Sequence, residues 1–349
     1  MFAAVNSTAL QETVFPFLSG DGRELKLRRV RGRLDPDKGP VLLVHGAGVR
    51  ANIFRAPVDE NLVQHLVKEG YEVWLEEWRA SIELPFCHWT LDQAALYDHP
   101  KAVAAVVQES GWSRVKAVIH CQGSTSFTMS ALAGLVPQVD TIVSNAVSLV
   151  PVVPDFSGFK LRWALPLLHL LKDHLDPRWG DHAEDAAAWL IRSVALLFHR
   201  ECRNGVCRMV SFTYGAGFPA LWRHENLNME THEWLRREFA RVPLTFFDQI
   251  RRCVQAGGLI SVDGHPELPA NYLTEPLRTE ARWTFIAGKL NRCFLPESQI
   301  RAFQHFDRRQ PGRHSLHVLP TYSHLDVFMG EQAHRDTFPL IARALQQGA

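Results

Sequence analysis

The sequence predicts an α/β protein: a mainly parallel sheet with helices on both faces, interrupted by a helical insertion. Short apolar runs typical of buried strands alternate with helical segments on both sides of a long interruption, which is the pattern of parallel sheets. Between residues 151 and 260, strand-like runs become scarce and helical segments replace them. The pentapeptide at 119–123, Ile-His-Cys-Gln-Gly, places a cysteine between a predicted strand and a predicted helix.

The first half of the predicted core starts with a hairpin. Residues 13–31 alternate around Gly20-Asp21-Gly22, which indicates two antiparallel strands joined by a turn. Thr90 is a plausible N-cap for the helix that follows it. The predicted strands are 41–44, 71–75, 115–119 and 141–147, and the predicted helices are 61–68, 91–109 and 124–135.

The interruption divides the chain into a core, residues 1–150 and 261–349, and a helical cap, residues 151–260. Helices are expected at 161–171, 186–197 and 231–239; the core resumes with strands 283–287 and 315–319 and helices 297–304 and 335–347. The stretch 161–171, rich in Leu and containing Trp163, is more apolar than an exposed helix requires. Packing over a substrate pocket is favoured over contact with a membrane surface, because the stretch has few charges.

Composition restricts the possible partners. The 349 residues include 38 Lys and Arg and 37 Asp and Glu, a formal net charge of +1 without a basic stripe, which disfavours nucleic acid. Met1 to Ser19 lacks the pattern of a signal peptide, and no apolar segment is long enough for stable membrane insertion. Six scattered Cys suit a reducing compartment, so a cytoplasmic location is expected.

Cys121 is the candidate nucleophile. A strand, a sharp turn and a helix with the nucleophile at the turn form a nucleophile elbow. A thiolate attacks carbonyl carbon well near neutral pH, because a nearby imidazole can hold it ionised. The alternative is a structural cysteine packed at a strand end.

The loop that follows strand 41–44 is rich in glycine and is predicted to build an oxyanion hole. Glycines let the backbone turn tightly and direct amides into a cleft. The expected donors are the backbone amides of Ala47 and Gln122. Phosphate binding is disfavoured, because neither a P-loop ending nor the dinucleotide glycine pattern is present. The residues expected to shape the loop and the elbow are His45, Gly46, Gly48 and Gly123.

His324 lies just past the last predicted strand and is the candidate general base. Asn291, three residues beyond Gly288, lies where the residue that orients this base is expected. An Asn can accept a hydrogen bond from imidazole and hold its tautomer, as in Cys-His-Asn proteases of another fold. Asp155 and Asp326 are the alternative orienters.

Together these residues resemble the α/β-hydrolase superfamily across nearly the whole chain. Residues 44–50, 78–81, 120–124 and 291–298 are similar to the hydrolase-like domain found beside or fused to cholesterol-oxidase-type flavoproteins. That resemblance implies lipid or steroid chemistry and a flavoprotein oxidase as a pathway partner, although the chain has no flavin-binding glycine pattern. The elbow also resembles polyhydroxyalkanoate synthases, from which the chain departs: Ile119 replaces a usual Gly, and Asn291 replaces an Asp.

The predicted function is acyl transfer to water by an esterase, thioesterase or lactonase acting on a small apolar ester, thioester or lactone. The alternatives are an acyltransferase and a non-catalytic binding protein on a hydrolase fold. No cofactor and no metal are predicted. His199, Cys202 and Cys207 are close enough in sequence to suggest zinc with His224 as a fourth ligand, but ordinary thiols are favoured, and a local disulfide is a further alternative.

Overall fold

The computed structural model describes residues 10–200 and 202–347. Of Met1 to Ser19, the segment predicted to lack a signal peptide, residues 1–9 lie outside these ranges. The core is an eight-stranded sheet with the order β1-β2-β4-β3-β5-β6-β9-β10. Only β2 runs against the others, pairing antiparallel with β1 and with β4, and the remaining neighbours are parallel. The predicted mainly parallel sheet is therefore confirmed.

The strands lie close to their predicted positions. The hairpin is formed by β1 (Gln11–Leu18) and β2 (Glu24–Arg31). The inner strands are buried along nearly their whole length, as strands covered on both faces must be. They are β3 (Pro40–Val44), β4 (Glu72–Glu77), β5 (Val115–His120), β6 (Val139–Asn145) and β9 (Arg282–Gly288), with β10 (Ser315–Leu319) at the edge.

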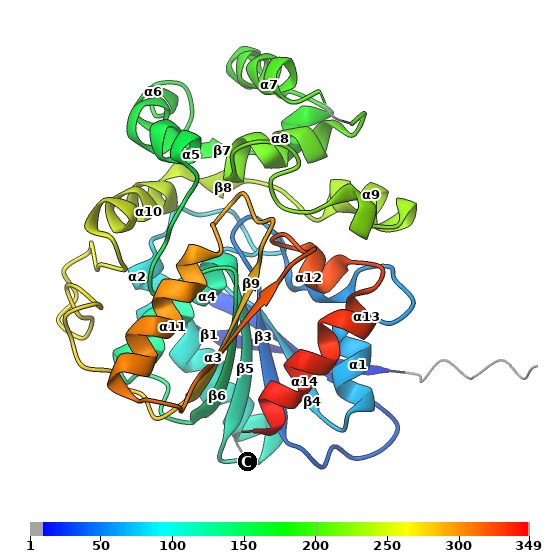
Figure 1. Cartoon of the computed structure of the whole chain (residues 1–349), viewed down its shortest axis with the longest axis vertical. Coiled ribbons are helices and arrows are strands. Elements are labelled where there is room, and N and C mark those ends of the chain that lie inside the picture. Colours follow the sequence, from blue (N-terminus) through cyan, green and yellow to red (C-terminus); the bar gives the residue numbers. More distant parts are fainter. Residues whose placement is uncertain (1–9, 201, 348–349) are drawn as a thin grey trace, which may run out of the picture.

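Two groups of helices cover the two sides of the sheet (Figure 1). On one side α1 (Leu62–Lys68) packs beside α14 (Phe338–Gln346), with α12 (Asp326–Met329) and α13 (Ala333–Asp336) nearby. On the other side α3 (His99–Ser110) packs beside α4 (Cys121–Leu132), and α11 (Glu297–Arg309) packs on β9. The prediction of one closing helix at 335–347 is wrong in one respect, because the helix is interrupted at Thr337, between α13 and α14.

The predicted helix 91–109 is a composite. Thr90 caps α2 (Leu91–Gln93) as predicted, since its side chain accepts a hydrogen bond from the amide of Gln93 at 3.2 Å. A π-helical turn, η2 (Ala94–Asp98), then leads into α3. The widened turn ends at the buried Asp98, whose carboxylate accepts a hydrogen bond of 2.6 Å from the guanidinium of Arg79.

Residues 151–260, here called the helical insertion, leave the sheet after β6 and lie over the carboxyl ends of the parallel strands (Figure 1). Two of its helices, α8 and α10, and a short sheet of β7 and β8 were not predicted. The first predicted helix begins earlier than expected, because α5, η3 and α6 run on from Asp155. The elements are α5 (Asp155–Phe159), η3 (Lys160–Ala164), α6 (Leu165–Leu168), β7 (His174–Leu175), η4 (Pro177–Gly180), α7 (Ala186–Phe198), α8 (Gly205–Tyr214), η5 (His224–Asn226), α9 (Met229–Trp234), η6 (Leu235–Arg237), β8 (Val242–Pro243) and α10 (Leu244–Ala256).

The helical insertion is attached to the loop that follows β3. The guanidinium of Arg50 donates two hydrogen bonds to the carboxylate of Glu238, at 2.7 and 2.6 Å. The amide of Ala240 donates to the carbonyl of Gly48 at 3.1 Å. Bidentate ion pairs of this kind fix orientation as well as distance, so the insertion and the glycine-rich loop keep one relative position.

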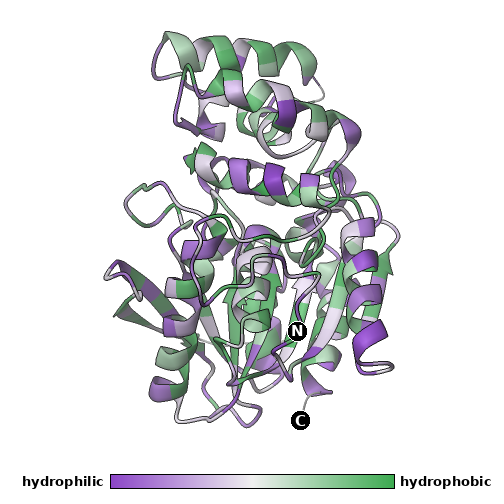
Figure 2. Ribbon diagram, turned by 90° about the vertical axis from the view of Figure 1, so that its left-hand side faces the viewer, coloured by the Kyte–Doolittle hydropathy of each residue, from purple (hydrophilic) through white to green (hydrophobic). Residues whose placement is uncertain are grey.

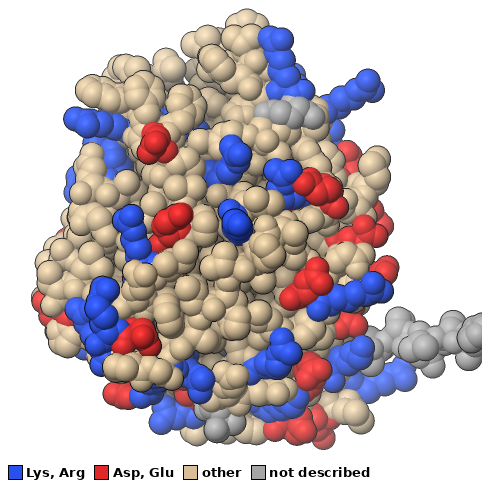
Figure 3. Space-filling model, in the orientation of Figure 1, with Lys and Arg blue, Asp and Glu red and all other residues tan. Residues whose placement is uncertain are grey.

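Apolar and charged residues are distributed differently over the molecule. Hydrophobic residues fill the strands and also line the helices of the insertion (Figure 2). On the face shown in Figure 3, Lys and Arg are mixed with Asp and Glu, and no single-sign stripe is visible. Within residues 10–200 and 202–347, no helix is both long enough and apolar enough to cross a bilayer.

Candidate active site

Cys121 sits at the junction of β5 and α4 in a strained backbone conformation. Its φ is 55°, in the left-handed region that residues with a side chain rarely adopt. Small neighbours make the turn possible. A Cβ at Gly123 would overlap the carbonyl oxygen of His45, and a Cβ at Gly46 would come within 2.9 Å of that of Cys121. Ile119, the departure from the usual Gly, is fully buried in β5 and leaves the elbow intact.

The surroundings of Cys121 favour its thiolate. Burial raises the pKa of this thiol, but hydrogen bonds from the Cys293 thiol, from His324 and from the amide of Gln122 outweigh burial, so the pKa lies well below its ordinary value. The pKa of Cys293 is raised well above its ordinary value by burial and by the neighbouring Cys121. Of the two thiols, Cys121 therefore forms its thiolate more readily, and Cys293 donates a hydrogen bond to it.

Asn291 contacts His324 as predicted, but the hydrogen bond runs the other way. Its Oδ1 accepts the amides of Cys293 at 2.9 Å and Phe294 at 3.2 Å. These two donors fix the orientation of the side-chain amide. The Nδ2 of Asn291 therefore faces Nδ1 of His324 at 3.1 Å and donates to it. The expected role of Asn291 as an acceptor is wrong in this conformation: it holds the neutral imidazole with its hydrogen on Nε2, and it opposes the imidazolium.

The two alternative orienters lie elsewhere. Asp155 is exposed at the start of α5. Asp326 is fully buried, and its carboxylate accepts hydrogen bonds from the amide of Ser323 at 2.8 Å and from the side chain of Asn226 at 2.7 Å. Burial, outweighing these hydrogen bonds, raises the pKa of Asp326 to about 6. Asp326 thus shapes the loop that carries His324.

His120, the residue before Cys121, also belongs to the site. Its ring lies 4.6 Å from that of His324, centroid to centroid. The Nδ2 of Asn145 donates to Nδ1 of His120 at 2.9 Å and to the carbonyl of His324 at 3.1 Å. Burial lowers the pKa of His120 well below its ordinary value. His120 is therefore a neutral wall of the site.

A ring nitrogen of His120, a ring nitrogen of His324 and the sulfur of Cys121 lie within 4.8 Å of one another, close enough to hold a metal. The asparagines argue against one. A ligating imidazole normally donates its second N–H to an acceptor, whereas Nδ1 of both rings accepts an amide N–H here. The hydrogen then lies on Nε2, which leaves no lone pair for a metal.

The glycine-rich loop is held against the elbow from below. The indole of Trp78 donates to the carbonyl of His45 at 3.1 Å, and Nε2 of His45 lies 3.4 Å from the buried carboxylate of Glu77. The hydroxyl of Tyr214 donates to the carbonyl of Ala47 at 3.2 Å. These contacts fix the loop that carries the Ala47 amide, and the Gln122 amide lies at the start of α4.

A separate hydrogen-bonded chain of an acid, a His and a Ser involves α4 about one turn beyond Cys121. The Nδ1 of His99 is 2.8 Å from Glu76, and its Nε2 is 2.8 Å from the hydroxyl of Ser126. All three side chains are fully buried. Ser126 also donates to the carbonyl of Gln122 at 2.9 Å. No reacting carbonyl can reach Ser126, so this line supports the elbow.

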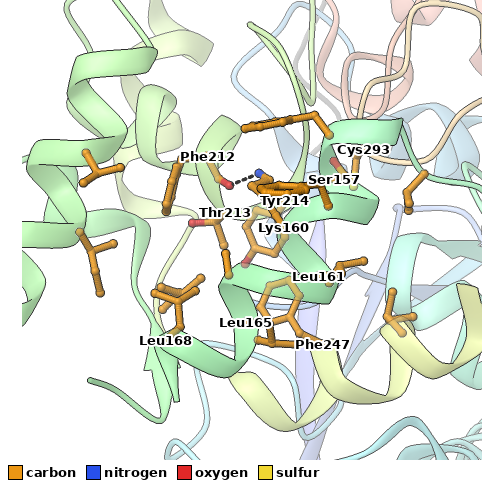
Figure 4. Close-up of a pocket in the computed structure, with 18 of the residues that line it drawn as sticks. Ser157, Lys160, Leu161, Leu165, Leu168, Phe212, Thr213, Tyr214, Phe247 and Cys293 are labelled. Carbon is orange, nitrogen blue, oxygen red and sulfur yellow. Dashed lines mark hydrogen bonds between the residues drawn. The ribbon is translucent and has the colours of Figure 1, made fainter. Parts of the chain in front are cut away.

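A cavity of about 580 Å³ opens at Cys121. Its floor comes from the core, through Cys121, Gln122, Cys293 and Phe294. Its walls come from the helical insertion and are almost entirely apolar (Figure 4). They include Leu161, Leu165, Leu168, Phe212, Ile191 and Phe247.

Lys160 is the charged side chain in this wall. Its ammonium donates to the carbonyl of Phe212 at 2.6 Å, a bond visible in Figure 4. Burial lowers the pKa of Lys160 to about 8. This hydrogen bond joins η3 to the end of α8, so it stabilises the cavity wall.

No protein-family profile matches the chain. The monoacylglycerol lipase of Paleococcus ferrophilus superimposes with a TM-score of 0.57 at 14% identity, over 94% of this chain and all of that one. The chain has the α/β-hydrolase fold. It is also 22% identical over 346 residues to lipase member K of Mus musculus, covering 89% of this chain and 80% of the lipase. Its 23% identity to sterol esterase 2 of Saccharomyces cerevisiae covers 39% of this chain and 30% of that protein.

These likenesses are to esterases and lipases. The finer resemblances, to hydrolase domains associated with cholesterol-oxidase-type flavoproteins and to polyhydroxyalkanoate synthases, remain predictions, as does a flavoprotein partner. The contacts that the sequence missed join separate strands: Asn145 pairs with His120 across β6 and β5. A polar residue at the end of the strand next to the elbow was the available signal.

Proposed function

We propose that this protein is an acyl-transfer hydrolase that uses Cys121 as nucleophile on apolar acyl thioesters and esters. The observation that carries the proposal is the position of Cys121: a strained elbow residue whose sulfur, with a lowered pKa, lies at the floor of an apolar cavity. Strain at a residue that packing alone does not require is typical of catalytic positions.

Acylation needs no proton transfer from the protein when the leaving group is a thiolate. The sulfur of Cys121 forms a bond to the carbonyl carbon, and the carbonyl oxygen becomes an oxyanion that accepts the amides of Ala47 and Gln122. The intermediate then collapses: the carbonyl re-forms, the bond from the carbonyl carbon to the leaving-group sulfur breaks, and the substrate thiolate leaves. The product is an acyl thioester of Cys121. An alkoxide is much more basic and needs a proton, so thioesters are favoured over oxygen esters.

Deacylation places a different demand on His324. Water attacks the acyl carbon and gives a proton to Nε2, which must then carry a lone pair, so the imidazole hydrogen moves to Nδ1. Asn291 must turn its Oδ1 toward Nδ1 and give up the amides of Cys293 and Phe294. Two hydrogen bonds are worth about 2 kcal/mol, a factor of about 30 in rate. We infer that deacylation is slow and that the acyl-enzyme accumulates.

The experiment is intact-protein mass spectrometry after mixing with a panel of acyl thioesters and oxygen esters of increasing acyl size, combined with stopped-flow turnover. The expected result is a mass increase of one acyl group on Cys121 and a burst of leaving group equal to the enzyme concentration. Cys121→Ala removes both, and Cys87→Ala, on the half-buried loop before α2, keeps both. Turnover by the Cys121→Ala protein would overturn the proposal.

The same orientation of Asn291 favours a second function, transfer of the acyl group to an alcohol or amine. If His324 activates water poorly, a bound acceptor competes for the acyl-enzyme. Adding alcohols and amines to preformed acyl-enzyme distinguishes the two: an acyltransferase releases ester or amide faster than acid. A protein that only binds apolar ligands gives neither a mass increase nor a burst.

A further inference from the structure

Far along the chain from the elbow, the helical insertion brings two thiols and two imidazoles together. One ligand atom from each lies within 4.8 Å of the other three. The sulfur of Cys207 is 3.4 Å from Nε2 of His224, and the sulfur of Cys202 is 4.0 Å from Nε2 of His232. The two imidazole rings are nearly perpendicular, with centroids 4.9 Å apart. We call these four residues the thiol–imidazole cluster.

These distances fit a tetrahedral metal site. Zinc binds sulfur at about 2.3 Å and imidazole nitrogen at about 2.0 Å, so sulfur and nitrogen ligands on one ion lie about 3.6 Å apart. The two measured sulfur–nitrogen distances, 3.4 and 4.0 Å, bracket that value. Two Cys and two His are a common ligand set of structural zinc.

We propose that the helical insertion binds one structural zinc ion through four side chains: Cys202, Cys207, His224 and His232. Four protein ligands leave no open position for substrate or water, which distinguishes a structural from a catalytic zinc. The prediction of no metal came from the sequence, where His232 was not considered. Cys202 and Cys207 have a C-x4-C spacing that zinc sites use, but His224 and His232 lie farther apart in the sequence than the usual H-x3–5-H pair. His199, the third residue considered there, does not belong to the thiol–imidazole cluster.

The local backbone supports this ligand set. Asn204 lies between the two cysteines, and its Oδ1 accepts the amide of Cys207 at 3.0 Å. Its Nδ2 donates to the carbonyl of His232 at 3.0 Å. One buried side chain therefore positions two of the four ligands. Such outer-shell contacts are a regular part of metal sites.

The competing explanations account for less. A disulfide between Cys202 and Cys207 would not explain why an imidazole faces each of the two sulfurs. Core packing does not explain the cluster either, because three of its members are only half-buried. Half-burial also gives a metal ion a route of entry.

The site would fix one wall of the cavity. Cys207 lies in the first turn of α8, and the last turn of the same helix contributes Phe212, Thr213 and Tyr214 to the cavity lining. The ion joins the start of α8 to η5 and α9. Its loss would loosen this wall, and the elbow in the core would keep its geometry.

The test uses the untagged full chain, purified without chelators, and measures metal content by inductively coupled plasma mass spectrometry. We expect about one zinc per chain. Replacing zinc by cobalt should give the visible bands of tetrahedral cobalt and thiolate-to-cobalt charge transfer in the near ultraviolet. Wild-type protein that binds neither metal, or in which peptide mapping finds a Cys202–Cys207 disulfide, overturns the proposal.

Variants separate the ligands from their neighbours. His232→Ala and Cys207→Ser should each weaken zinc affinity at least tenfold. His199→Ala and Cys87→Ser should keep the metal. If Cys207→Ser does not fold, the half-buried His232→Ala still gives the answer, and unchanged zinc content in that variant contradicts the site. Metal content and cobalt spectra do not depend on activity, so a failure of the proposed hydrolase function would leave this result readable.

Discussion

The core and the helical insertion use apolar residues in opposite ways. In the core, apolar side chains on β3, β4 and β5 are buried, so the sheet is a closed hydrophobic interior. In the helical insertion, Leu170 is 80% exposed and Phe198 is 73% exposed, and the large apolar residues of α5 to α7 face the cavity or the solvent. Exposed apolar surface of this kind marks a ligand-binding region. On the proposed function, the core would fix the reacting atoms and the insertion would provide the surface that selects the acyl group.

If this division is correct, changes in the core alter kcat and changes in the insertion alter KM and acyl selectivity. The largest effect is expected for Cys121→Ser. A hydroxyl is not ionised near pH 7, and His324 is held by Asn291 in the tautomer that cannot accept its proton. We expect kcat to fall by about a thousandfold or more with KM little changed, as for loss of a nucleophile. Steady-state kinetics beside Cys87→Ser test this, and a fall confined to KM contradicts it.

Gly123→Ala should be the next largest. In the middle of a helix this change normally stabilises, by about 0.5–1 kcal/mol, but here the new Cβ overlaps the carbonyl of His45. The elbow and the glycine-rich loop must move apart, and displacements near 1 Å cost about a hundredfold in rate. The matched control is Gly264→Ala, where φ is 73° and the space is open; it should lower the melting temperature slightly and leave kcat unchanged. Equal kcat in both variants would refute the steric explanation.

The pH dependence of alkylation distinguishes Cys121 from an ordinary thiol. The pKa of Cys121 is lowered, and burial raises that of Cys87. As pH falls from 9 to 6, Cys87 loses its thiolate first, while Cys121 keeps it until pH passes its own lower pKa. An ordinary thiol with pKa near 8.5 is less than about 1% ionised at pH 6, so iodoacetamide should label Cys121 about a hundredfold faster there. Peptide mass spectrometry between pH 5 and 9 measures both rates; parallel profiles contradict the assignment.

Sequence reasoning succeeded where one local signal determines one position. Apolar runs located the core strands, and residue types at strand ends singled out Cys121, His324 and Asn291, whose side chains the structure brings close together. Sequence reasoning failed where the course of the backbone decides. The direction of the Asn291 hydrogen bond depends on the backbone amides of Cys293 and Phe294, which residue identity does not reveal.

The insertion was harder to predict, although α10 buries Phe246, Ile250 and Cys253 at helical spacing, so the sequence did carry the signal for this helix. The thiol–imidazole cluster draws its four members from three elements and a loop. The fold brings the two His to the Cys pair, and only that pair has the spacing of a short zinc motif.

Asn291→Asp tests the tautomer argument within the core. One carboxylate oxygen can keep the amides of Cys293 and Phe294 while the other accepts Nδ1–H of His324. The cost of about 2 kcal/mol for turning the wild-type amide is then removed, and the carboxylate stabilises the imidazolium that forms as water gives up its proton. We expect deacylation to accelerate about tenfold or more and the burst to disappear, with the gain greatest for oxygen esters. Stopped-flow kinetics decide; a slower deacylation means that Asn291 already presents its oxygen to His324.

The smallest effect, and the one that isolates the insertion, comes from two leucines on the same helical stretch. Leu168 lines the cavity, whereas Leu170 is exposed and does not line it. Leu168→Trp should fill part of the 580 Å³ and raise KM for long or bulky acyl groups several-fold, since each excluded CH₂ forfeits about 0.8 kcal/mol of burial. The rate of Cys121 acylation by short acyl groups should not change, because the core is untouched. Leu170→Trp should leave the profile of activity against acyl length as in the wild type. If both substitutions shift that profile equally, the exposed surface around Leu170 also binds the acyl group, and the binding site extends beyond the cavity.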